Sequence, residues 1–476
     1  MKAIVIGSGP VGCMTAMRFR ERGWDVQICE GGSDPRTLRR RSRRSINLTL
    51  SRRGLRTLPA EIQSTLYEQG VPCVTRIVHH RDGSVTSQAY GLTSEEHLLS
   101  ISRELLNRIL LDCAERAGVR IDFGQECVQA DLERASATFL SQGELRSLQA
   151  DVLVGCDGTN STVRHEMSRR GARMSLSQSF IAHSYIELAV PVAPDGGYAW
   201  GRTEASLSSN GQTERGLHVW PRGTHMLLAL PNLDQSYTAS LFIPTVSTAA
   251  DEPSFKTLDS PSRVQEFFQT YFSDAVPHIP NLSQEFLSKV PATLRTLKCD
   301  PYHFGRAVLL GDAAHTMVPF FGQGVNSGFE DVQVFFSVLD KAHGGETLEQ
   351  QVRRTVSDFT RLRRPSAHAI TDLSLGNFRE LVDHSGQPAF QARHAIERAL
   401  YLRYPQRFRP LLNMVSFAEL SYDEVAKIHK VQSAKLDRCC QLFDPVHQPE
   451  RVIRAYLDES DAASSGEFEV AVSSLS

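Results

Sequence analysis

The chain has 476 residues, of which 41% are hydrophobic and 22% charged, and its 52 basic and 54 acidic residues give a formal net charge of −2. This apolar content and low net charge exclude an intrinsically disordered chain. They also disfavour a dedicated nucleic-acid-binding protein, which usually carries a basic excess. The length predicts two or three domains with a large buried core.

Cysteine usage and hydropathy predict a cytoplasmic protein without a membrane anchor. The nine cysteines form no CxxC or CxxxC pair and mostly lie in apolar runs, a pattern typical of buried free thiols in a reducing compartment. Their spacing does not support a zinc site. The first residues begin a strand at once, unlike a signal peptide, and no segment approaches the ~18 apolar residues that a membrane helix needs.

The first 30 residues predict a nucleotide-binding βαβ unit. Residues 2–6 and 26–30 form apolar runs of strand length, and residues 11–22 between them have helical periodicity. Two such strands joined through a helix are the minimum unit of a nucleotide-binding fold.

A glycine-rich turn joins this strand to the helix and fits the pattern GxGxxG. Gly7 permits the tight turn, Gly9 lets the backbone approach a pyrophosphate, and Gly12 permits close packing of helix on strand. Glu30 ends the second strand and is placed to bind a ribose hydroxyl. An acid there disfavours a 2′-phosphate, so FAD or NAD fits better than NADP. A glycine turn without function is the alternative, and the surrounding elements favour binding.

Two later strand ends favour FAD over NAD. Residues 151–154 predict a buried strand that runs into an Asp-Gly turn at Asp157, and residues 307–310 predict another that ends at Asp312 and opens a helix. An aspartate at the second place can accept a hydrogen bond from a ribityl hydroxyl, and the helix start can face the flavin pyrimidine. Each turn alone is common, but the three elements in this order are specific.

The remaining chain divides by its hydropathy pattern. Residues 100–117 predict an amphipathic helix, and residues 176–250 alternate as antiparallel strands do, with Gly, Pro and Asn turns between them. Residues 324–339 predict a long helix, and residues 350–456 are mainly helical. The Ser-rich tail at residues 458–476 predicts disorder.

Residues 36–44, with the sequence RTLRRRSRR, form a run of basic charge. The simplest interpretation is a solvated loop or helix face. The alternative is a basic funnel that attracts an anionic cofactor.

These motifs resemble those of the single-component, FAD-dependent aromatic hydroxylases. The resemblance rests on the glycine turn with Glu30, on Cys156-Asp157-Gly158, and on Gly311-Asp312-Ala-Ala-His315 followed by Pro319. Within that class the chain is similar to the kynurenine 3-monooxygenase family in RSINL (44–48), SRELLNRILLD (102–112), LHVWPRG (217–223), ALPN (229–232) and VPFFGQGVN (318–326). The resemblance extends from residue 4 to about residue 415.

The resemblance implies an α/β aromatic-hydroxylase fold, in which a Rossmann-like FAD-binding domain carries a β-rich substrate domain and a helical C-terminal region. The implied domains are a FAD-binding domain of residues 1–75, 99–175 and 291–375, a β-sheet substrate domain of residues 76–98 and 176–290, a helical region of residues 376–457 and a tail of residues 458–476.

The resemblance also implies the chemistry. FAD stays bound, NADPH reduces it after the aromatic substrate binds, and O2 then gives a C4a-hydroperoxyflavin that transfers one oxygen to the ring. With L-kynurenine the aniline nitrogen activates the ortho position, which gives 3-hydroxykynurenine and water. The cofactor carries the difficult step, so no catalytic side chain and no metal are expected. His315 is expected to be structural.

The family's substrate residues can be assigned one at a time. Arg76 matches the arginine that pairs with the amino-acid carboxylate, a task that suits a guanidinium fork. Tyr90 matches a tyrosine that also holds the carboxylate, and Asn377 matches an asparagine at the amino-acid end. The apolar residues that match the wall around the aromatic ring are Leu98, Leu217, Leu228, Leu230, Phe242, Pro319 and Phe320. Without the resemblance, Arg76 is a surface arginine and most of the wall is ordinary core.

The family's cofactor residues can be assigned in the same way. Arg103 matches an arginine on the FAD side, and the loop under the flavin pyrimidine matches residues 322–326. The full implied set is Gly7, Gly9, Gly12, Glu30, Arg103, Asp157, Asp312, Gly322, Gly324, Val325 and Asn326.

Three positions depart from the family pattern. Leu412 stands where a second tyrosine for the carboxylate is expected, which removes one hydroxyl donor. Thr49 sits where a smaller alanine can occur, and Gly31 follows Glu30 where a basic residue is common. The chain ends in a polar tail, so the C-terminal membrane anchor of the family's eukaryotic members is not expected.

These departures leave three hypotheses for function. The first is hydroxylation of L-kynurenine. The second is hydroxylation of a substituted kynurenine or another aminoaromatic compound in secondary metabolism. The third is a flavin-holding binding or sensor protein that has lost turnover, and the intact set of polar substrate residues argues against it.

Overall fold

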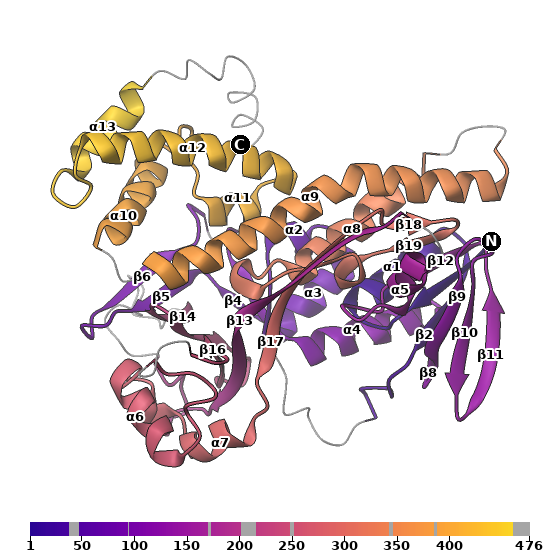
Figure 1. Ribbon diagram of the computed structural model, residues 1–476, viewed down its shortest axis with the longest axis horizontal. Helices are drawn as coiled ribbons and strands as arrows, with labels where there is room; N and C mark the ends of the chain where they lie inside the picture. Colours follow the sequence, from indigo (N-terminus) through magenta and orange to yellow (C-terminus); the bar gives the residue numbers. More distant parts are fainter. Residues whose placement is uncertain are drawn as a thin grey trace. The chain divides into compact units, whose positions relative to one another are not determined.

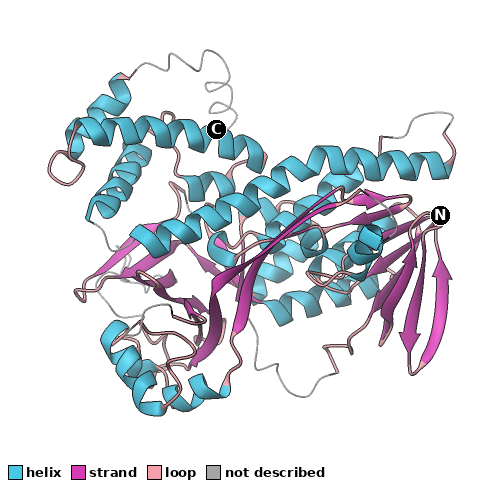
Figure 2. Cartoon of the chain, viewed as in Figure 1, coloured by secondary structure: helices cyan, strands magenta, loops and turns pink. Residues whose placement is uncertain are grey.

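The computed structural model describes residues 1–37, 47–93, 95–169, 173–200, 216–247, 252–341, 346–384 and 388–459 (Figure 1). Both helices and strands are abundant in it (Figure 2). Most of the basic run, from residue 38, and the tail from residue 460 lie outside the described residues, so the predictions for them stay predictions.

The chain divides into two compact units, and each is described by itself. Unit 1 comprises Met1–Val71, Leu99–Ile181 and Leu294–Thr371. Unit 2 comprises Pro72–Leu98, Ala182–Thr293 and Asp372–Ser476. Each unit is assembled from three stretches of chain, so neighbours within a unit can be far apart in the sequence.

Unit 1 is built on a six-stranded sheet with the order β18-β19-β12-β1-β2-β8. Its strands are β1 (Lys2–Ile6), β2 (Asp25–Glu30), β8 (Arg120–Phe123), β12 (Val152–Gly155), β18 (His303–Phe304) and β19 (Ala307–Leu309). All pairs are parallel except β18–β19. The central strands are buried along most of their length, as the apolar runs predicted, because helices cover a parallel sheet on both faces.

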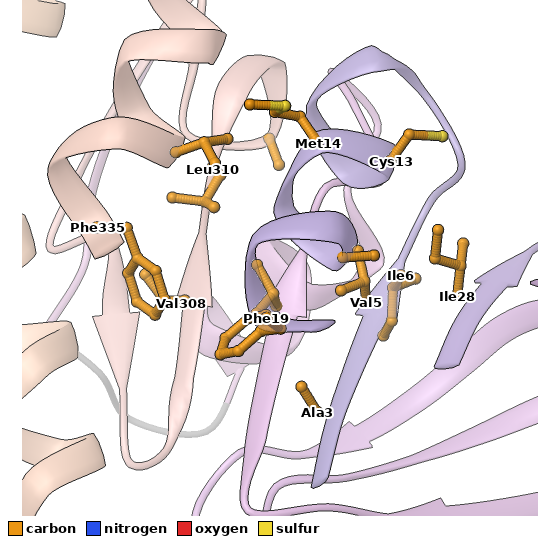
Figure 3. Packing of buried hydrophobic residues seen from close by; sticks show 14 of the residues in the cluster. Ala3, Val5, Ile6, Cys13, Met14, Phe19, Ile28, Val308, Leu310 and Phe335 are labelled. Carbon is orange, nitrogen blue, oxygen red and sulfur yellow. The ribbon is translucent and has the colours of Figure 1, made fainter. Parts of the chain in front are cut away.

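The helices of unit 1 supply the rest of its core. They are α1 (Pro10–Glu21), α2 (Arg52–Leu55), α3 (Ala60–Gln69), α4 (Arg103–Arg116), α5 (Thr162–Arg169), α8 (Gly324–Leu339) and the first part of α9 (Leu348–His384). Figure 3 shows Phe19 of α1 and Phe335 of α8 in this core. Their rings meet edge to face with centroids 5.8 Å apart. The helices predicted at residues 11–22 and 324–339 are confirmed.

Smaller strands complete unit 1. A three-stranded antiparallel sheet contains β9 (Glu126–Asp131), β10 (Ser136–Ser141) and β11 (Glu144–Gln149). Strand β3 (Asn47–Leu50) pairs antiparallel with β7 (Leu98–Ser102), and β4 (Val71–Cys73) lies at the boundary between the units. Two strands, β13 (Ser175–Val190) and β17 (Ala292–Asp300), carry the chain from one unit to the other.

The prediction that a helix begins at Asp312 is wrong. The chain forms only a single 3₁₀ turn there, η3 (Gly311–Ala313), followed by β20 (His315–Thr316) and a second turn, η4 (Pro319–Phe321), before α8 begins. Gly311 and Gly322 both have φ of +63°, a left-handed conformation that interrupts a right-handed helix. The segment is therefore a folded loop.

Unit 2 contains a sheet in the strand order β13-β16-β15-β14-β5-β6. Its further strands are β5 (Thr75–His79), β6 (Val85–Ala89), β14 (Gly216–Arg222), β15 (His225–Pro231) and β16 (Tyr237–Pro244). Strands β13 to β16 pair antiparallel, as the alternation predicted, whereas β5 pairs in parallel with β14.

The alternation of β14 separates two faces of this sheet. Leu217 and Val219 point to one face, where they join Leu230 in a small apolar cluster. His218 and Trp220 point to the other, where Trp220 joins the core under α6 (Pro261–Tyr271), η2 (Val276–His278) and α7 (Leu282–Ser288).

The C-terminal part of unit 2 is helical, as the sequence predicted. After the end of α9 it contains α10 (Pro388–Arg403), α11 (Leu411–Phe417), α12 (Tyr422–Leu442) and α13 (Pro449–Asp458). Buried apolar residues such as Leu400, Leu436 and Val452 form its core. No helix in the described part of the chain combines the length and the apolar content that crossing a bilayer requires.

Candidate cofactor and substrate sites

Three turns that are distant in the sequence meet at one edge of the unit 1 sheet. The Gly7 N–H donates to the Cys29 carbonyl at 2.9 Å, and the Cys156 N–H donates to the Ile6 carbonyl at 2.8 Å. The Leu310 N–H donates to the Gly155 carbonyl at 3.0 Å. Because parallel strands end at the same edge, the turns after β1, β12 and β19 form one surface, the place where nucleotides bind in such folds.

The glycine turn after β1 is open at Gly9 and closely packed at Gly7 and Gly12. Gly7 has φ of +101°, and a Cβ on it would lie 2.4 Å from the Cys156 carbonyl oxygen. A Cβ on Gly12 would lie 2.0 Å from the Gly7 oxygen. Around Gly9, in contrast, no atom lies within 4 Å of an added Cβ. The turn is closely packed at Gly7 and Gly12 and open at Gly9, which fits the approach of a pyrophosphate.

Two carboxylates border this turn. The two oxygens of Glu30 each accept one backbone N–H, from Ser8 and Gly32, both at 2.8 Å. Each oxygen keeps a second lone pair that can accept a ribose hydroxyl. Asp157 Oδ2 accepts from the Thr162 N–H at 2.7 Å, while Asp157 Oδ1 is buried and has no partner among the described residues. Burial raises the pKa of Asp157.

Asp312 and Arg103 place opposite charges near each other. Surrounding protein raises the pKa of the Asp312 carboxyl by desolvation, although its side chain still meets solvent, and the Arg103 charge opposes that rise. Arg103 begins α4, is exposed, and makes no ion pair in the described part of the chain. Both side chains therefore remain available to a polar ligand.

A buried charge network, which no sequence motif predicted, holds the Gly311-Asp312 turn. Asp331 of α8 accepts from the Gly311 N–H at 2.7 Å, from His315 Nε2 at 2.6 Å and from Arg363 Nε at 2.6 Å. Burial alone would raise the pKa of Asp331, but the charges of His315 and Arg363 hold it below its usual range. Glu330 beside it pairs with Arg53 at 2.6 Å. Two adjacent acids inside an apolar helix are the signal that could have revealed the network.

The loop before α8 is tied to β3 through Asn326. The Asn326 Oδ1 accepts from the Ser51 N–H at 3.0 Å, and its Nδ2 donates to the carbonyls of Thr49 and Gly322 at 2.9 and 2.8 Å. A Cβ on Gly322 would lie 2.1 Å from Thr49 Oγ1, whereas Gly324 faces open space. Asn326 therefore positions the loop with both ends of its amide, and Val325 beside it is half-buried.

In unit 2 the structure brings Arg76 and Tyr90 together. Arg76 of β5 donates from Nη2 to the Gln88 Oε1 of β6 at 3.1 Å and has no ion pair among the described residues. The Tyr90 side chain is 6% exposed, and no described residue hydrogen-bonds its hydroxyl. Burial raises the pKa of Tyr90, and the Arg76 charge acts against that rise. An unpaired cation thus stands beside an unpartnered buried hydroxyl.

Tyr90 also belongs to an apolar cluster that contains Leu412. This cluster comprises Cys73, Tyr90, Leu98 and Phe417, with Leu412 of α11 packed against it. The side chain that replaces the expected tyrosine therefore contacts the cluster of Tyr90 and offers it no hydrogen bond.

The other predicted wall residues fall into separate groups. Leu217, Leu228 and Leu230 share one cluster on β14 and β15. Phe242 of β16 stacks on Tyr185 of β13 with ring centroids 5.5 Å apart. The remaining two wall residues, Pro319 and Phe320, lie on η4 in unit 1. Asn377, which was predicted for the amino-acid end of the substrate, lies on α9 in unit 2.

Comparison with known proteins defines the class of this protein. A family model described as "FAD binding domain" matches residues 1–374. The solved structure of the tetrameric form of 2-methyl-3-hydroxypyridine-5-carboxylic acid oxygenase shares the fold, with a TM-score of 0.63 at 22% identity over 82% of this chain and 95% of that one. Together with the nucleotide edge of unit 1, these matches define a FAD-dependent aromatic hydroxylase fold, as predicted.

Closer relatives define the family. Kynurenine 3-monooxygenase of Stenotrophomonas maltophilia (strain K279a) is 35% identical over 432 residues, which are 90% of this chain and 90% of that protein. Kynurenine 3-monooxygenase of Sus scrofa is 35% identical over 426 residues, which are 88% of this chain and 84% of that protein. The chain belongs to the kynurenine 3-monooxygenase family, and the predicted resemblance is confirmed.

Proposed function

We propose that this protein is a FAD-dependent monooxygenase that hydroxylates L-kynurenine at the ring carbon ortho to the aniline nitrogen. The reaction consumes L-kynurenine, NADPH, H⁺ and O2, and it yields 3-hydroxykynurenine, NADP⁺ and water. The match to proteins named kynurenine 3-monooxygenase over nine-tenths of this chain carries the proposal. The unpaired Arg76 beside Tyr90 supports it, because the substrate presents a carboxylate.

The unit 1 edge holds the cofactor in this proposal. Gly9 and the start of α1 would hold the pyrophosphate, because backbone N–H groups and the helix dipole favour negative charge there. Glu30 would accept a ribose hydroxyl, and Asp312 would accept a ribityl hydroxyl. When bound, FAD supplies the transfer of electrons from NADPH and the activation of O2.

The unit 2 residues bind and orient the substrate in this proposal. Arg76 donates to the carboxylate, the Tyr90 hydroxyl donates a second hydrogen bond, and Asn377 binds the amino-acid end. The leucines of β14 and β15 surround the aromatic ring and exclude water, which strengthens the polar contacts at the other end.

Leu412 favours a second candidate function, the hydroxylation of a substituted kynurenine or a related aminoaromatic acid. Its side chain replaces a hydroxyl donor with apolar surface next to Tyr90. Loss of one such hydrogen bond weakens binding by about 1–2 kcal/mol unless another donor replaces it. A substrate with additional apolar surface at this end would gain from the same change.

The test is NADPH oxidation by the purified yellow protein with and without L-kynurenine, followed by mass analysis of the product. We expect L-kynurenine to accelerate NADPH oxidation and to gain one oxygen atom. Formation of hydrogen peroxide alone, or no acceleration, contradicts the proposed substrate. Turnover across kynurenines substituted on the ring or at the amino-acid end then separates the two candidates.

A further inference from the structure

Arg398 of α10 is, like Arg76, a half-buried cation of unit 2 without an ion pair among the described residues. Its neighbours on the same helix behave differently. Arg393 pairs with Asp437, and Arg403 pairs with Glu450 at 2.9 Å. A surface arginine usually finds an acid or lies free in water, so a half-buried arginine without either needs an explanation.

The helix that carries Arg398 is attached to the segment that carries Tyr90. The Tyr401 hydroxyl of α10 donates to Glu96 Oε2 at 3.1 Å, and burial beside this acid raises the pKa of Tyr401 to about 12. Asn413 of α11 donates to the Tyr90 carbonyl and lies 3.4 Å from the Tyr401 hydroxyl. Arg398 lies one turn before Tyr401 on the same helix face, so it faces the same segment.

The electrostatics of the two arginines agree with this placement. Burial lowers the pKa of Arg398, and the positive charge of Arg76 lowers it further. Two guanidinium groups that repel each other, neither of which has an ion pair in the described part of the chain, make a site that favours an anion. The hydroxyl of Tyr90, which is nine-tenths buried and has no partner among the described residues, provides an independent donor on the Arg76 side of this site.

We propose that Arg398 is a second arginine for the substrate carboxylate and acts together with Arg76 and Tyr90. A carboxylate offers about four lone-pair sites, enough for donors from all three side chains. One negative charge between the two guanidinium groups also removes their mutual repulsion. Arg398 supplies the donor that Leu412 cannot, and this inference rests on the proposed function.

The test compares two ligands in matched variants of the FAD-loaded protein. The ligands are L-kynurenine and kynuramine, which lacks the carboxylate, and binding is followed by the change in flavin absorbance. Arg398→Gln is expected to weaken L-kynurenine binding roughly ten- to a hundredfold and to leave kynuramine binding unchanged or tighter. Arg398→Lys should retain part of the affinity, because it keeps the charge but loses the fork.

Arg403→Gln is the matched control, because it removes an exposed arginine from the same helix, and it should bind both ligands as the wild type does. Equal weakening of both ligands by Arg398→Gln would overturn the inference and make Arg398 structural. No change for either ligand would also overturn it. A third outcome is that the wild type fails to bind L-kynurenine and still binds another aromatic acid in a way that depends on Arg398. That result would overturn the proposed substrate and support the contact between Arg398 and a carboxylate.

Discussion

The two units prepare their sites in opposite ways. Unit 1 uses backbone, and its key positions are glycines at which a side chain would collide with a neighbouring carbonyl. Its buried charges are also neutralised internally, as Asp331 with Arg363 shows. Unit 2 uses side chains and leaves Arg76 and Arg398 without acids among the described residues. The unit 1 site therefore needs glycines, which have no side chain to block the ligand. The unit 2 site needs arginines that no acid of the protein neutralises.

The largest expected effect breaks the backbone site. In Gly12→Ala the new Cβ would lie 2.0 Å from the Gly7 oxygen, a contact that only movement of α1 or the turn can relieve. We expect nearly complete loss of bound FAD, measured as the ratio of flavin to protein absorbance after gel filtration. Gly9→Ala is the control, since its φ of −66° and open surroundings suit alanine. It should melt like the wild type and bind FAD more weakly, and full FAD content in Gly12→Ala would contradict the packing argument.

The second prediction tests whether the internal charge network supports the backbone site. Asp331→Asn leaves the buried Arg363 with only the Glu330 carboxylate, at 3.2 Å, so we expect the free energy of unfolding to fall by about 3 kcal/mol. Urea unfolding of the apo-protein measures this cost, and FAD titration should show weaker binding because Asp331 holds the Gly311 N–H. Asp340→Asn, at the exposed end of α8, should cost less than about 1 kcal/mol. Equal costs for the two variants would show that the network is not important.

The third prediction concerns the side-chain site. Arg76→Ala removes a charged donor to the substrate, so the KM for L-kynurenine should rise roughly ten- to a hundredfold. FAD content should change little, because Arg76 belongs to unit 2 and the FAD edge to unit 1. Steady-state kinetics and flavin absorbance measure the two quantities. Equal loss of both would mean that Arg76 is structural.

The smallest expected effect concerns the histidines on the other face of the unit 2 sheet. His218 lies between His79 and Tyr237, at 2.9 and 3.2 Å, and His79 in turn contacts Asp274 at 2.7 Å. Burial holds the pKa of His218 well below its usual range, and the nearby His79 lowers it further, whereas Asp274 opposes the shift.

The sign of the pH effect follows from this lowered pKa. Above about pH 6.5 His218 is neutral in both the folded and the unfolded chain, so it does not lower the free energy of unfolding. Below it the unfolded chain binds the proton first, so stability falls as the pH falls. His218→Gln should therefore shrink the drop in Tm between pH 7.5 and 5.5 by roughly 2–4 °C. An unchanged drop in Tm would assign the effect to the other buried or half-buried histidines with lowered pKa, which are His183, His225, His278, His303, His368 and His429.

Local pattern was enough to predict much of unit 1. The strand, glycine turn and helix of residues 2–22 need only neighbouring residues, and hydropathy reports them directly. The prediction of a helix at Asp312 was wrong because Gly311 and Gly322 adopt left-handed backbone conformations, which interrupt a right-handed helix. Periodicity does not report such breaks unless the backbone conformation of each glycine is known.

Contacts over long sequence distances could not be predicted. Arg53 meets Glu330 across 277 residues, and Tyr401 meets Glu96 across 305, so no local pattern links either pair. No local pattern indicates Arg398 either, because its proposed role depends on Arg76 and Tyr90, which lie far from it in the sequence. The domain boundaries stay predictions. The roles of the site residues also stay predictions, and the variants above test several of them.

The assembly of unit 1 from three stretches matters while the chain is being made. β12 emerges from the ribosome long before β19, because the central part of unit 2 is translated between them. Until β19 arrives, β12 is the edge of the parallel sheet, with unpaired N–H and C=O groups and a buried-type sequence, VLVG, exposed. Such an edge invites pairing with other chains. The nascent protein therefore passes through an aggregation-prone stage that ends only when about two-thirds of the chain, up to β19 (Ala307–Leu309), has been synthesised.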